Sequence, residues 1–87
     1  MLKIRDGVDL KELEKYGFIY NVYENSIHSY QKHIIWNEEE VYYYYICADK
    51  NSSDYREIII ETEMQFSGFD DTLYDLIKAD LIEKVDE

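Results

Sequence analysis

Three glutamates spaced along one alternating segment, Glu57, Glu61 and Glu63, have the clearest potential for recognition chemistry. Residues two apart in a strand lie ~6.6 Å from one another, and DNA presents a phosphate about every 3.4 Å of axial rise on each strand. Glu61 and Glu63 therefore match alternate phosphate steps. The simpler interpretation is a solvated strand face, because any alternating acidic strand has this spacing. Further acids could extend the field over adjacent surface: Glu38, Glu39, Glu40, Asp70, Asp71, Asp75 and Asp80.

The charge of the chain is unevenly distributed. Twenty Asp and Glu against nine Lys and Arg give a formal net charge of -11. Residues 1–35 contain five acids and five bases, so the whole excess lies from Trp36 onward. Such a field repels nucleic acid and anionic lipid and attracts basic proteins, with association rates that fall as salt rises. The alternative is that the acidity only keeps a small domain soluble.

A run of four tyrosines, residues 42–45, is the second candidate for a binding surface. Alternate residues of a strand point to opposite faces, so two of the rings, assigned to Tyr43 and Tyr45, face away from the helices. They either cover cross-strand neighbours or form a partner-binding or homodimer surface, since exposed tyrosines commonly anchor such patches.

Catalytic motifs are missing from the sequence: it has no phosphate-binding glycine loop, nucleophile elbow or His-x-x-x-His. His28 and His33 are five residues apart, which in a strand places them on opposite faces. Cys47 ends a central strand, where a buried thiol behaves as an inert hydrophobe. We expect no enzymatic activity, catalytic residue, metal site or cofactor. A small enzyme or ligand-binding domain built on these three residues is the least favoured alternative.

The length of 87 residues predicts a single domain, residues 1–87. No apolar run approaches the ~18 residues of a membrane span, and the first nine residues lack a signal-type apolar stretch. We expect a soluble, cytoplasmic protein.

Helix signals mark both ends of the chain. Asp9 as N-cap, Glu12 completing a capping box and Gly17 as the stop predict a helix over residues 10–16. Asp70 as N-cap predicts an amphipathic helix over residues 71–79. Residues 81–85 fit either an extension of this helix or a short strand.

Between the two helices the hydrophobic period changes to two. Runs at residues 18–22, 30–36, 41–48 and 55–64 predict four antiparallel strands, and residues 2–5 are a possible edge strand. The predicted fold class is α+β, an antiparallel sheet of about four strands with an N-terminal and a C-terminal helix packed on one face.

The two ends also carry a resemblance. Residues 2–5 (LKIR), 8–18 (VDLKELEKYGF) and 72–85 (TLYDLIKADLIEKV) resemble small uncharacterised acidic proteins of prophages and other mobile elements of low-GC Gram-positive bacteria. The resemblance implies a setting in which DNA mimics, including anti-CRISPR and anti-restriction proteins, block host nucleic-acid-binding proteins.

The preferred function is therefore a phage-type inhibitor whose acidic surface occupies the basic nucleic-acid-binding surface of a host defence protein, without binding nucleic acid or membrane itself. The alternative is a homo-oligomeric interaction module that uses the tyrosine-rich strand. The sequence does not name the partner.

Overall fold

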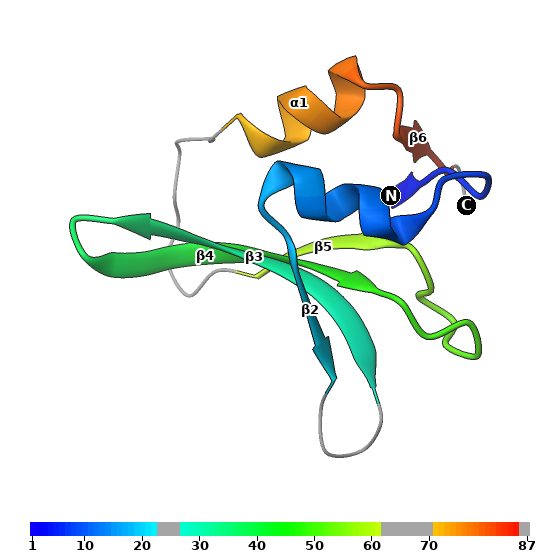
Figure 1. The fold of residues 1–87 in the computed structure, drawn as a ribbon, viewed down its shortest axis with the longest axis horizontal. Helices are drawn as coiled ribbons and strands as arrows, with labels where there is room; N and C mark the ends of the chain where they lie inside the picture. Colours follow the sequence, from blue (N-terminus) through cyan, green and yellow to red (C-terminus); the bar gives the residue numbers. More distant parts are fainter. Residues whose placement is uncertain (23–26, 62–70, 86–87) are drawn as a thin grey trace.

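The computed structural model describes residues 1–22, 27–61 and 71–85. The elements run in the order β1 (Leu2–Ile4), the 3-10 helix η1 (Leu10–Tyr16), β2 (Ile19–Val22), β3 (His28–Trp36), β4 (Glu39–Cys47), β5 (Ile58–Glu61), α1 (Thr72–Lys78) and β6 (Ile82–Lys84). The strands β2-β3-β4-β5 form an antiparallel sheet in chain order, and β1 pairs with β6 in a second, two-stranded sheet. Both helices lie on one side of the larger sheet, with η1 between the sheet and α1 (Figure 1).

The helix η1 follows from local signals in the sequence. The Asp9 carboxylate accepts a hydrogen bond from the Lys11 amide, and Gly17 ends the helix at a φ of 90°. Leu10 and Leu13 are buried and lie three residues apart, which matches the three residues per turn of a 3-10 helix. The short helix therefore turns one apolar ridge toward the sheet.

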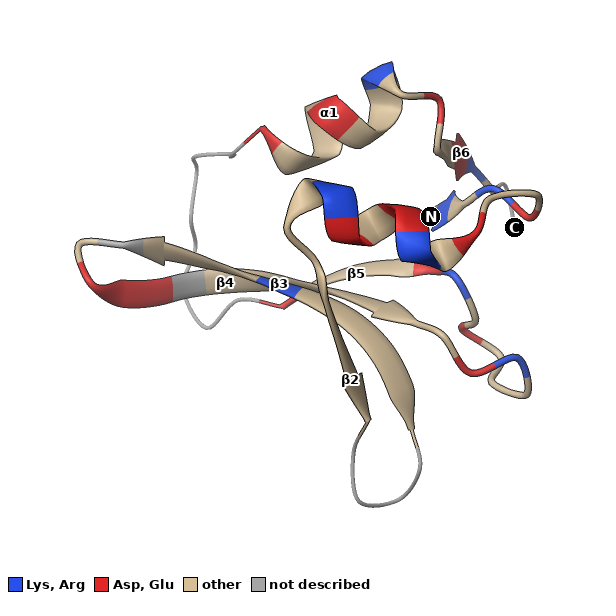
Figure 2. Cartoon of the chain, viewed as in Figure 1, with Lys and Arg blue, Asp and Glu red and all other residues tan. Residues whose placement is uncertain are grey.

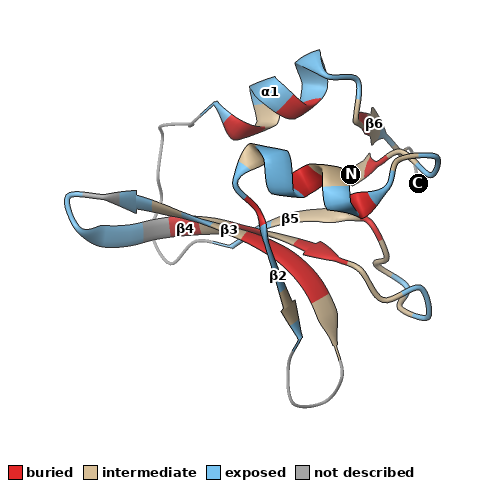
Figure 3. Ribbon diagram, in the orientation of Figure 1, coloured by how far each residue is buried: buried red, intermediate tan, exposed pale blue. Residues whose placement is uncertain are grey.

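The hydrophobic core lies between the sheet and the helical layer (Figure 3). Even-numbered residues of β3 as far as Ile34 and of β4 from Tyr42 onward face this side, because Tyr30 pairs with Ile46 and Ile34 with Tyr42. A β-bulge then shifts the register, so that Ile35 pairs with Glu40. Tyr44 and Ile46 are fully buried. Among the described residues, the buried cluster comprises Ile4, Leu10, Leu13, Phe18, Tyr30, Tyr42, Tyr44, Ile46, Leu76 and Ile82.

The end of α1 turns the chain into β6. The amides of Asp80 and Leu81 donate to the carbonyls of Ile77 and Leu76, and Asp80 has a φ of 60°. This is the hydrogen-bond pattern of a Schellman motif, which reverses the chain after a helix. Arg5 holds the turn, because Nε donates to the Asp80 carbonyl at 3.2 Å and Nη2 to its carboxylate at 3.0 Å.

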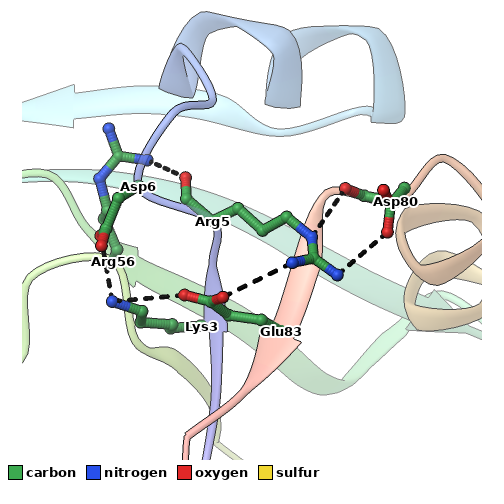
Figure 4. Close-up of polar contacts among 6 residues, drawn as sticks. All are labelled: Lys3, Arg5, Asp6, Arg56, Asp80 and Glu83. Atoms are coloured by element: carbon green, nitrogen blue, oxygen red, sulfur yellow. Dashed lines mark hydrogen bonds and ion pairs between the residues drawn. The ribbon is translucent and has the colours of Figure 1, made fainter.

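Arg56 joins the two sheets (Figure 4). Its side chain is 9% exposed, and Nη1 donates to the carbonyls of Arg5 and Val8, each at 2.8 Å. Its own amide bonds to the Cys47 carbonyl, and its carbonyl accepts from the Ile4 amide. The backbone of Arg56 is left-handed, with a φ of 71°.

The predicted architecture, a single four-stranded sheet with a helix at each end, is wrong. The chain begins and ends in β1 and β6, which form a sheet of their own beside the meander. The segment 81–85, which could have been helix or strand, contains β6, and the segment 2–5 pairs with it as β1 rather than extending the larger sheet as its edge strand. A bridge between Lys3 and Glu57 is the point where β1 meets the extension of β5.

Three details of the predicted elements are also corrected. The predicted strand 55–64 begins later than expected, as β5, because the left-handed backbone at Arg56 interrupts extended structure before Ile58, and residues 62–64 lie outside the described residues. The capping box at η1 is replaced by an ion pair, since Glu12 binds Lys15 at 2.6 Å. The N-cap of α1 is Asp71, without a side-chain hydrogen bond, and Asp70 lies outside the described residues.

Within the described residues, neither helix is long and apolar enough to cross a membrane.

Candidate functional site

The outer face of the larger sheet, turned away from η1 and α1, presents the odd-numbered residues of β3 and β5 and, beyond the bulge at Val41, those of β4 from Tyr43 onward. His33 pairs with Tyr43, and Tyr43 pairs with Glu61, so these three side chains form one row across the sheet. The next row joins Gln31, Tyr45 and Ile59.

The tyrosine run is divided between the two faces as the alternation predicts. Tyr42 and Tyr44 are buried in the core, whereas Tyr43 and Tyr45 are half-buried on the outer face. The Tyr43 ring stacks on His33, with centroids 4.9 Å apart and an interplanar angle of 18°. Much of the Tyr43 surface is therefore already covered within the chain.

The turn between β3 and β4 carries three consecutive exposed glutamates, Glu38, Glu39 and Glu40. Asn37 and Glu38 have φ values of 51° and 67°, the signature of a two-residue type I′ hairpin turn. Glu39 and Glu40 therefore belong to the first residues of β4, and Figure 2 shows their charge at the end of the hairpin.

A polar chain on β3 orients the imidazole of His33. Gln31 donates from Nε2 to the Ser29 hydroxyl at 3.2 Å, and its Oε1 lies 3.0 Å from His33 Nε2. The other ring nitrogen, Nδ1, contacts the Glu40 carboxylate. Both ring nitrogens of His33 thus lie beside oxygen atoms, Oε1 of Gln31 and the Glu40 carboxylate.

Two of the three glutamates predicted to share one strand face, Glu57 and Glu61, can be placed, and they have different neighbours. Glu61 is exposed at the end of β5, beside Tyr43. Glu57 precedes β5 and is half-buried, and its backbone forms an antiparallel β-bridge with Lys3. Glu63 lies outside the described residues, and so does the predicted match of Glu61 and Glu63 to alternate phosphates.

The remaining predicted acids lie in the helical layer. Asp71 and Asp75 are exposed on α1, on the opposite side of the sheet from the row of His33, Tyr43 and Glu61. Asp80 is engaged in the ion pair with Arg5. The acidic array predicted from the sequence is therefore split into a hairpin group and a helical group.

Counter-ions are concentrated away from the hairpin. Lys3 bonds to Asp6 at 3.0 Å and lies 3.5 Å from Glu83, a carboxylate that also pairs with Arg5 (Figure 4). The bond to Asp6 is the main cause that raises the pKa of Lys3. In residues 1–22, 27–61 and 71–85, the carboxylates paired with Lys or Arg are those of Asp6, Glu12, Asp80 and Glu83.

The exposed acids of the hairpin and β5 lie outside these ion pairs. We call the group formed by Glu38, Glu39, Glu40, Glu61, His33 and Tyr43 the hairpin patch. Sequence reasoning named every member as a binding residue except His33, which it considered only for the least favoured alternative of a small enzyme or ligand-binding domain. The spacing of Ser29, Gln31 and His33 at i, i+2 and i+4 was the signal that they share a face.

The residues considered for catalysis do not form one site. His28 contacts the Tyr20 hydroxyl on the core side, and His33 lies on the outer face. Cys47 is 2% exposed, with its thiol 4.0 Å from the Asp49 carbonyl. Over the described part of the chain, no three His, Cys, Asp or Glu side chains gather in a way that could hold a metal ion.

Comparison of the chain with models of known families, with curated proteins and with solved structures found no match.

Proposed function

We propose that the protein is a non-enzymatic cytoplasmic inhibitor of the kind carried by phages and mobile elements, and that its hairpin patch binds the basic nucleic-acid-binding surface of a host defence protein. The observation that carries the proposal is the exposure of Glu38, Glu39, Glu40 and Glu61, none of which pairs with a Lys or Arg in the described residues. Carboxylates already neutralised within the chain would gain little from a basic partner, whereas Glu38, Glu39 and Glu61 have no counter-ion in the described residues and Glu40 contacts the His33 imidazole.

The shape of the hairpin supports the same function. Its end projects beyond the helical layer (Figure 1), so a concave basic groove can receive it without contact with α1. The type I′ turn and the two paired strands hold the carboxylates in a fixed arrangement. A preorganised charge array loses less conformational entropy on docking than a flexible acidic tail does.

The homo-oligomeric module built on the tyrosine-rich strand has weaker support. Tyr43 is stacked on His33 and Tyr45 is half-buried, so little ring surface remains to anchor a partner.

The test is displacement of fluorescently labelled duplex DNA from purified RNA-guided nucleases and restriction enzymes, followed by anisotropy. The wild-type protein should displace DNA from at least one of them. The triple variant Glu38→Gln, Glu39→Gln, Glu61→Gln should lose at least about tenfold in affinity, because truncating one desolvated charge pair costs ~2 to 5 kcal/mol.

The matched control removes the same charge from the helical layer through Glu14→Gln, Asp71→Asn and Asp75→Asn, all at exposed positions. It should keep most of the affinity, since the general acidic field acts mainly on the association rate. Equal losses in the two triple variants, or no displacement by the wild-type protein, would exclude the hairpin patch as the binding site.

A further inference from the structure

The strand β2 forms an edge of the larger sheet and is apolar on both of its faces. Ile19, on the outer face, is 66% exposed, and Tyr20 and Val22, on the core side, are 43% and 54% exposed. The strand contains no charged residue, proline or bulge in its pairing with β3. Natural proteins protect edge strands with such features, so an edge that lacks them is a template for pairing with another strand.

The charge distribution indicates which strand can pair there. The strand β2 is uncharged, so it offers no charge complementarity to a charged strand and fits a partner strand that is itself apolar and uncharged. Residues 1–35, which include β2, are balanced between acids and bases. The edge of β2 is therefore the place where a second copy of this chain can approach with little electrostatic repulsion.

We propose that β2 pairs antiparallel with β2 of a second copy, about a two-fold axis perpendicular to the sheet. Residues directly opposite one another must then lie on the same face, which restricts the register. In the register centred on Asn21, Tyr20 of one copy lies opposite Val22 of the other, and the pair occurs twice. Aromatic and β-branched residues form favourable cross-strand pairs, and the two meanders become one eight-stranded sheet.

This interface does not depend on the proposed function, because β2 and the β3–β4 turn extend in different directions from the molecule (Figure 1). Both hairpin patches stay accessible in the dimer. A pairing of two four-residue strands is small compared with the ~1,200 Å² or more that stable interfaces bury, so the dimer is weak and reversible. Because each copy carries the same net charge, added salt should strengthen the dimer, whereas it should weaken binding to a basic partner.

Sedimentation over a concentration series up to about 1 mM, which detects dissociation constants as weak as about 1 mM, tests the pairing. The wild-type protein should show a dimer that grows with concentration and with salt. Ile19→Lys and Val22→Lys should each lower the association constant at least about tenfold, since they place like charges at the seam. Ile77→Lys is the matched control, because Ile77 is 58% exposed on α1, and it should associate like the wild type.

A second measurement does not depend on the affinity. In a Cys47→Ala background, Asn21→Cys places two thiols at the symmetry axis, with Cβ atoms about 4.5 to 5.5 Å apart, close enough for a disulfide after small adjustment. Oxidation should give a covalent dimer, and Cys at the exposed position 77 should not. A protein that stays monomeric throughout, a dimer dissociated by Ile77→Lys but not by Val22→Lys, or equal cross-linking at both positions overturns the proposal.

Discussion

Replacement of Arg56 should have the largest effect of any single polar substitution in the described part of the chain. The guanidinium is buried and donates from Nη1 to the carbonyls of Arg5 and Val8. Hydrogen bonds from a charged donor contribute ~1.5 to 3 kcal/mol each, so Arg56→Met should cost about 3 to 6 kcal/mol. The Arg56 guanidinium also lies 5.0 Å from the centre of the Tyr55 ring, and that contact is lost as well.

The size of this loss can be compared with the total stability. A chain of this length has an unfolding free energy of roughly 4 to 13 kcal/mol, so Arg56→Met removes a large share of it. Urea denaturation followed by circular dichroism measures the change. Arg56→Lys, which keeps a charged donor, should lose less.

The backbone at position 56 supplies an independent check. A left-handed conformation costs an L-residue ~1 to 2 kcal/mol, and the φ of Arg56 is 71°. Arg56→Gly should therefore be more stable than Arg56→Ala by about 1 kcal/mol, although both lose the guanidinium. A stability for Arg56→Met within about 1 kcal/mol of the wild type, or Ala more stable than Gly, would refute the role assigned to this residue.

Three smaller perturbations test the hairpin and the core. Glu38→Gly should raise the unfolding free energy by about 1 kcal/mol, because Asn-Gly is the preferred sequence of a type I′ turn. A thermal melt measures the change, and destabilisation would contradict the turn assignment. Tyr44→Lys should unfold the domain, since Tyr44 is fully buried. The unfolding free energy of Tyr43→Lys should stay within about 1 kcal/mol of the wild-type value. Equal urea midpoints for the two variants would contradict the assigned faces. Burial is the main cause that raises the pKa of Tyr30 above its usual 10.0. Unfolded Tyr30 therefore loses its proton first, and stability should fall as pH rises above about 10; Tyr30→Phe should reduce this fall, and an unchanged pH dependence would contradict the burial argument.

Much of the central meander could be predicted from the sequence, because its strands pair with their neighbours in the chain. The alternation placed β2, β3 and β4 within a few residues of their observed bounds, and Gly17 stopped η1 as expected. The first two residues of β4, Glu39 and Glu40, were not predicted as strand. Glutamate is depleted in strands, but the hairpin end lies in solvent and accepts them.

The small sheet could not be predicted, since β1 and β6 are separated by nearly the whole chain. Leu2 pairs with Lys84, and three-residue strands carry too little pattern to indicate a partner. The exposure of Ile77 could not be predicted either: a helical period predicts which residues share a stripe, but not how much of that stripe the neighbouring elements cover.

The acidic array was predicted as one field, but its members have different neighbours. Glu57 pairs with Lys3 of β1, Glu61 lies beside Tyr43 in the hairpin patch, and Asp75 lies on α1. The left-handed backbone at Arg56 also makes the extended segment begin at Glu57 rather than at Tyr55. Single-sequence patterns do not reveal a positive φ at an arginine, because that residue type has no preference for it.

The salt dependence of partner binding tests the central claim most directly. For a nuclease from which the protein displaces DNA, the dissociation constant of the wild-type protein should rise steeply between about 50 and 200 mM salt, as for phosphate contacts. The triple variant Glu38→Gln, Glu39→Gln, Glu61→Gln should bind more weakly and with a shallower salt slope, because fewer ion contacts form. Equal slopes for the two proteins, or wild-type binding that does not change with salt, would contradict the account.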